Sequence, residues 1–96
     1  MVVLMVHMKV QPGTEEECKR LIRLMEEHTR QEPGCIQYVG HQSTEDATRF
    51  SFYETYKTRA DLDSHWASEH FRKYVKEGLD KIVMERTKEL SEPVSQ

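Results

Sequence analysis

The residues best suited to chemistry gather in one stretch, Arg49–Phe71, which holds the only tryptophan and two of the five histidines. Glu54 interrupts an apolar and aromatic run there, and a carboxylate in such a place needs a partner because its burial is costly. His65 and His70 follow, and an imidazole titrates near neutral pH, so either could move a proton. We therefore take Glu54, His65 and His70 as candidate catalytic residues, with His65 the first-choice hydrogen-bond donor to Glu54.

The spacing of the two histidines requires a break in the helix that carries them. Because they are five residues apart, their rings would point about 140° apart on an unbroken helix. Ser68 can cap a new helical piece, and a break there could bring the rings together at the mouth of a cavity. Alternatively, the histidines cap the broken helix, and Glu54 is a structural acid that ties its strand to the break or to another subunit.

Further side chains could contact a flat ligand. Tyrosines can donate a hydroxyl or stack on a ring, although half-buried tyrosines are also ordinary components of a sheet. A histidine on an apolar strand face could be a polar group inside a barrel, and the tryptophan could either line a pocket or wedge a helix onto the sheet. The candidate binding residues are His7, Tyr38, Phe52, Tyr53 and Trp66.

Four strands and two helical regions must position these residues. Strands are indicated by alternating or continuous apolar residues, and helices by apolar residues at helical spacing. Thr14 and Glu17 form a capping-box pattern at the start of the first helix. The predicted elements are a strand over 2–10, a helix from Thr14 to before Pro33, strands over 35–43 and 49–56, a helix over 59–66 that restarts at Ser68, and a last strand over 83–90.

This β-α-β-β-α-β order predicts an α+β, ferredoxin-like fold with a four-stranded antiparallel sheet and both helices on one face. The other, apolar face must then be covered, and a second copy packed sheet against sheet would do so. We therefore expect a homodimeric α/β barrel in which the partner subunit forms part of the cavity wall. Residues 1–90 form the single domain, and residues 91–96 form a polar tail.

Composition excludes several classes of partner. Of 96 residues, 36% are hydrophobic and 32% charged, so the core is thin and association is a reasonable way to bury more apolar area. The net charge of −3 argues against nucleic acid and against an anionic membrane. No run has the length of a membrane span or the pattern of a signal peptide.

Two cysteines make no disulfide framework, so we expect a cytoplasmic protein with reduced thiols.

Four short motifs occur in a fixed order along the chain: Val10–Gly13 (VQPG), Glu32–Cys35 (EPGC), Phe52–Tyr56 (FYETY) and His65–Phe71 (HWASEHF). In this order they resemble the antibiotic biosynthesis monooxygenase (ABM) family of dimeric α/β barrels, which includes quinol monooxygenase-like proteins. The resemblance covers residues 1–90, and one position departs from it, because the family more often carries tryptophan where this chain has Tyr56.

The resemblance implies oxidation of a small aromatic, quinol-type substrate by dioxygen in the barrel cavity, without a cofactor. Such chemistry needs a dry cavity, a base that removes the phenolic proton and donors that hold the anion, and a His/Glu pair could assist the deprotonation. Whether the chain is an enzyme stays open, because a non-catalytic small-ligand-binding or stress-related barrel module fits the same features.

Three other interpretations have less support. The same element order, with Phe50 and Phe52 on the third strand, also builds an RNA-recognition module, but the glycines of that motif are absent. The histidines lack the usual spacing of metal ligands, so no metal site is predicted. Haem-degrading relatives need an asparagine on the first strand, and the chain has no asparagine.

Overall fold

The computed structural model describes residues 1–95. They fold in the predicted β-α-β-β-α-β order of the ferredoxin-like α+β class, and the second helical region is divided into three short segments. The last two of these are a π-helical segment (η1) and a 3₁₀ turn (η2). The elements are β1 (Val2–Val10), α1 (Glu15–Thr29), β2 (Cys35–Gln42), β3 (Arg49–Tyr56), α2 (Arg59–Trp66), η1 (Phe71–Lys76), η2 (Leu79–Lys81) and β4 (Val83–Ser91).

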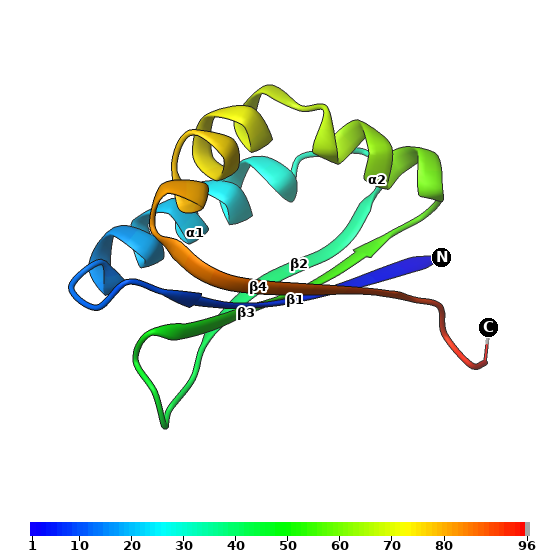
Figure 1. The fold of residues 1–96 in the computed structure, drawn as a ribbon. Coiled ribbons are helices and arrows are strands. Elements are labelled where there is room, and N and C mark those ends of the chain that lie inside the picture. The colour runs from blue at the N-terminus through cyan, green and yellow to red at the C-terminus, as the bar shows by residue number, and fades with distance from the viewer. Residues whose placement is uncertain (96) are drawn as a thin grey trace.

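The sheet has four antiparallel strands in the order β2-β3-β1-β4. All helical segments lie over one face of it, as Figure 1 shows. In the register of the strands, Glu54 on β3 is opposite Leu4 on β1 and Tyr38 on β2. The candidate carboxylate therefore stands in the middle of the sheet, on the row that faces the helices.

Strand alternation decides which side chains enter the core. On β1 the helix-facing residues Leu4, Val6 and Met8 are buried, and they pack with apolar residues of α1 and of the second helical region. Phe50 and Phe52 on β3 share this face and are also buried. They cannot stack on RNA bases, because an RNA platform requires aromatic side chains on the open side of the sheet.

Within residues 1–95, the opposite face of the sheet carries no helix. Met5, Tyr53 and Val39 stand in register across three strands there and make an apolar row. His7 lies on the same face and is exposed. The sequence of β1 could not settle which face the helices cover, since both parities of Val2–Val10 begin with apolar residues.

The two helices begin differently from one another. Thr14 makes no side-chain cap, so the predicted capping box at α1 is wrong; its hydroxyl donates instead to the Gln11 carbonyl at 2.6 Å and closes the turn before the helix. A capping box is present at α2, where Thr58 and Asp61 bond reciprocally. Among residues 1–95, no helix combines the length and the apolar character needed to cross a membrane.

Candidate functional site

A cavity of about 50 Å³ lies between the helix-facing side of the sheet and the segments α2 and η1. Its walls are mostly aliphatic and aromatic. The polar side chains among them are Glu54 and His65, which lie close to each other, and Arg86 and Lys88 of β4. The side chains that line the cavity come from the sheet and the helical segments of one chain. The expectation that a partner subunit forms part of the cavity wall stays a prediction.

The C-terminal end of α2 positions His65. The helix is capped at Thr58 and ends at Trp66, so His65 occupies its last turn. The imidazole is 1% exposed, and the rings of Tyr38, Tyr56 and Phe71 surround it with centroids 5.3–5.6 Å away. Aromatic packing on several sides therefore fixes the plane of the ring.

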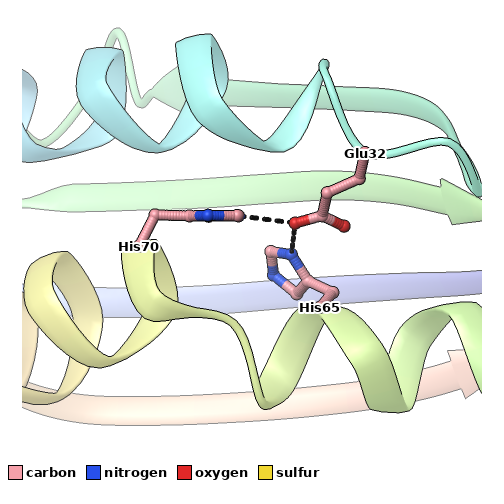
Figure 2. A group of neighbouring side chains, drawn as sticks. All are labelled: Glu32, His65 and His70. Carbon is pink, nitrogen blue, oxygen red and sulfur yellow. Dashed lines mark hydrogen bonds and ion pairs between the residues drawn. The ribbon is translucent and has the colours of Figure 1, made fainter.

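A break after α2 brings His70 to the same carboxylate as His65. The Ser68 hydroxyl donates to the His65 carbonyl at 2.6 Å and accepts from the Phe71 amide at 3.2 Å, so it ends one helical piece and caps the next. Glu32 Oε2 then lies 2.8 Å from His65 Nδ1 and 2.5 Å from His70 Nε2. Figure 2 shows the two rings converging on this one oxygen.

Glu32 is positioned by the loop between α1 and β2. Gly34 in that loop lies against the first turn of α2, where an added Cβ would stand 2.1 Å from Asp61 Cγ. Only glycine permits so close an approach of the backbone. The Lys57 amide donates to the Gly34 carbonyl at 2.9 Å and ties the loop to the end of β3. The turn Glu32–Cys35 thus holds the carboxylate against the helix break.

Glu54 is the most deeply buried carboxylate of the site, at 4% exposure. The Tyr56 hydroxyl donates to its Oε1 at 2.7 Å, and His65 Nε2 lies 3.8 Å from the same oxygen, beyond hydrogen-bond length. Burial raises the pKa of Glu54 from 4.5 to about 6, against the opposing effects of the Tyr56 hydrogen bond and the charge of His65. Burial also raises the pKa of Tyr56, with Glu54 adding to the effect, so the phenol keeps its proton and stays a donor.

The raised pKa makes the contribution of Glu54 to stability depend on pH. Since the folded pKa is above the unfolded one, this contribution is complete below pH 4.5 and is lost as the pH rises through 6. Glu54→Gln removes the charge and keeps an acceptor for Tyr56. At pH 8 we expect the variant to exceed wild type in free energy of unfolding by on the order of 2 kcal/mol, with little difference at pH 4.

Urea denaturation at a series of pH values between 4 and 8 measures this difference. Ser51→Ala on the open face of β3 is the control, and its effect should be independent of pH. A Glu54→Gln variant that is less stable than wild type at pH 8 would contradict the prediction.

The structure gathers most of the candidate residues around the cavity. His70 does not line the cavity, but it hydrogen-bonds to the same Glu32 oxygen as His65. His7 and Tyr53 lie on the opposite face of the sheet, because their positions on β1 and β3 alternate with the helix-facing ones. The candidate residues that line the cavity are Glu54, His65, Tyr38, Phe52 and Trp66.

Two contributors were missed from the sequence. Tyr56 bonds to Glu54, and its position two residues along the same strand face was a usable signal. Glu32 is the hydrogen-bond partner of His65 in place of Glu54, and it comes from 33 residues away. The one sequence feature that distinguishes Glu32 is its position directly before the Pro33–Gly34 turn. No local sequence pattern predicts that this turn lies against the helix break.

The tautomer of His65 follows from this geometry. A neutral imidazole that donates Nδ1–H to the Glu32 carboxylate has its lone pair on Nε2, on the side of Glu54. A carboxylate that orients an imidazole in this way is the usual arrangement of a general base. The site can therefore accept a proton at His65 Nε2 beside an apolar cavity.

Comparisons with known proteins agree with this architecture. An uncharacterised protein of Synechocystis is 33% identical over 82 residues, 85% of this chain and 56% of that protein, so the match spans little more than half of its length. The Bacillus subtilis protein YcnE, named as a presumed monooxygenase, is 30% identical over 83% of this chain and 84% of its own. The structure of a presumed antibiotic biosynthesis monooxygenase from Nitrosomonas europaea superposes with a TM-score of 0.92, at 29% identity, over 98% of this chain and 99% of that one.

A sequence profile decides the family. The profile described as antibiotic biosynthesis monooxygenase matches residues 1–77, which include β1 to β3, α2 and η1 and so every residue of the Glu32, His65 and His70 cluster. The chain belongs to the antibiotic biosynthesis monooxygenase family.

Proposed function

We propose that this chain is a cofactor-independent monooxygenase that oxidises a small, electron-rich aromatic of the quinol type with dioxygen. Membership of the family and the naming of YcnE as a presumed monooxygenase support this reaction class. The observation that carries the proposal is the placement of His65 Nε2. It stands beside Glu54 on an apolar cavity, while Glu32 holds Nδ1 at 2.8 Å.

The proposed reaction begins with proton transfer. His65 Nε2 accepts the phenolic proton, and the imidazolium that forms lies between the Glu32 and Glu54 carboxylates. The phenolate then gives an electron to dioxygen, and the two radicals combine on the ring. One oxygen atom stays in the product and the other leaves as water, so quinol and dioxygen give hydroxyquinone and water. No external reductant is required.

Substrate entry requires side chains to move, because about 50 Å³ has room for only a few water molecules. The basic side chains that contact Trp66, one from β4 and one from α2, are the candidates. Lys88 Nζ lies 5.5 Å from the Trp66 ring centroid, and Arg59 Cζ lies 5.4 Å from the same centroid. Exposed cation–π contacts of this kind are worth only about 0.5–1 kcal/mol, so binding of a ring can displace them.

Measurement of dioxygen uptake tests the proposal. The metal-free full chain is mixed with a panel of hydroquinones and anthrone-like phenols in an oxygen electrode. The expected result is uptake that scales with protein concentration, with one molecule of dioxygen used per hydroxyquinone formed. If no member of the panel raises uptake above its own autoxidation, the monooxygenase proposal fails and the small-ligand-binding module is the better description.

We further propose that two copies pack through the open faces of their sheets. The row of Met5, Tyr53 and Val39 supplies an apolar strip for this contact, and Tyr53 is 38% exposed in the single chain. A chain of 11.4 kDa should then show twice that mass in solution by light scattering. Tyr53→Lys should shift the species toward one chain, whereas Lys57→Ala, an exposed change outside the strip, should not. A wild-type mass of one chain would contradict the dimer.

A further inference from the structure

Glu32, His65 and His70 together form the donor set of a metal site. Glu32 Oε2, His65 Nδ1 and His70 Nε2 all lie within 4.8 Å of one another. They come from the α1–β2 loop, from the end of α2 and from the segment just before η1, and their side chains converge on one point (Figure 2). The spacing of the histidines along the sequence gives no sign of this cluster, because the fold assembles it.

The chemistry of the set suits a first-row divalent ion. Two imidazole nitrogens and one carboxylate oxygen are ligands that Zn²⁺, Co²⁺ and Ni²⁺ accept, with a position left for water. The three atoms are now held together by hydrogen bonds of 2.8 Å and 2.5 Å through Glu32 Oε2. Ligand atoms around a tetrahedral Zn²⁺ stand about 3.3 Å apart, so an ion that replaces the shared protons requires Glu32 Oε2 to move less than about 1 Å farther from each of the two nitrogens.

A second carboxylate supports the same assignment independently. A histidine that binds a metal through one nitrogen usually donates its other N–H to a carboxylate. Glu54 Oε1 lies 3.8 Å from His65 Nε2 on the side away from Glu32, and the Tyr56 hydroxyl holds it there at 2.7 Å. A buried carboxylate is therefore already positioned next to Nε2 of His65, the nitrogen that a metal bound at Nδ1 would leave free.

The path to solvent is on the side of the other two ligands. His65 is 1% exposed, whereas the side chains of Glu32 and His70 are 16% and 17% exposed. The His70 ring also stacks on His28, with centroids 5.6 Å apart, which keeps its Nε2 directed at Glu32. An ion can therefore enter past two partly exposed ligands and reach the buried third.

We propose that Glu32, His65 and His70 bind one divalent first-row transition-metal ion, with Glu54 as the carboxylate behind His65. Coordination of Nδ1 places the imidazole proton on Nε2. His65 then donates toward Glu54 and has no lone pair for a substrate proton. A bound ion would therefore switch off the base, and this consequence rests on the proposed monooxygenase function.

Titration of the metal-free full chain with Zn²⁺ by calorimetry, and with Co²⁺ by visible absorption, tests the site. We expect one ion per chain and Co²⁺ bands typical of nitrogen and oxygen ligation in four or five coordination. His70→Gln should weaken Zn²⁺ binding by at least tenfold, and Glu54→Gln by about 10- to 100-fold. His41→Gln, at an exposed histidine far from the cluster, is the matched control and should leave binding unchanged.

Circular dichroism confirms that each variant is folded, and Glu32→Gln replaces His70→Gln if that variant is not. Absence of saturable one-to-one binding would overturn the proposal, as would equal affinities for His70→Gln and His41→Gln. These measurements use no substrate, so their failure is distinct from that of the oxygenase proposal. If both hold, one equivalent of Zn²⁺ should abolish dioxygen uptake and a chelator should restore it.

Discussion

His65→Gln is expected to lower kcat for dioxygen uptake by about 10²- to 10⁴-fold, the range associated with loss of a general acid or base. Glutamine can still donate to Glu32 from inside the aromatic cage, but its amide cannot take up a proton at neutral pH. Since the cavity walls are unchanged, KM should move much less than kcat. The measurement is steady-state uptake with the best quinol of the panel.

Two further variants separate a lost base from a damaged fold. His65→Ala leaves a space next to the cavity, and added imidazole should restore part of its activity if the missing group is the proton acceptor. His41→Gln changes an exposed histidine outside the site and should keep wild-type turnover. Activity of His65→Gln within a factor of two of wild type would show that His65 is not the base.

Much of the architecture could be predicted because it depends on local patterns. The β2–β3 hairpin followed from two apolar runs around a short polar loop, and α2 was placed at Arg59–Trp66. Strand periodicity put Glu54 on the same face as Phe52, which is where the structure has it. Each of these inferences needs only the conformational preferences and spacing of neighbouring residues.

What could not be predicted depends on tertiary contacts. Both faces of β1 begin apolar, so its sequence did not say whether the cavity lies under the helices or between two sheets. The approach of Glu32 to His65 depends on Gly34 packing against Asp61, a contact between segments far apart in the sequence. The nearer carboxylate along the chain, Glu54, was therefore the natural but incomplete choice of partner for His65.

Glu32→Ala is expected to lower the free energy of unfolding by about 2 kcal/mol. The buried Nδ1–H of His65 loses its acceptor, and an unsatisfied buried donor costs about 1–3 kcal/mol. The partly exposed His70 can bond to water instead and adds little. In a chain of this size a loss of that order lowers Tm by roughly 10 °C.

Two matched variants assign this effect to the hydrogen bond rather than to the charge. Glu27→Ala removes the same charge from an exposed position on α1 and should change stability by less than about 0.5 kcal/mol. Glu32→Gln keeps an acceptor for His65 and should recover most of the loss. Thermal denaturation at pH 7 measures all three, and hydrogen exchange at residues 65–71 should quicken only in Glu32→Ala. If Glu32→Ala were no less stable than Glu27→Ala, the carboxylate would not be what joins the α1–β2 loop to the helix break, and the orientation of His65 would have to come from its aromatic neighbours alone.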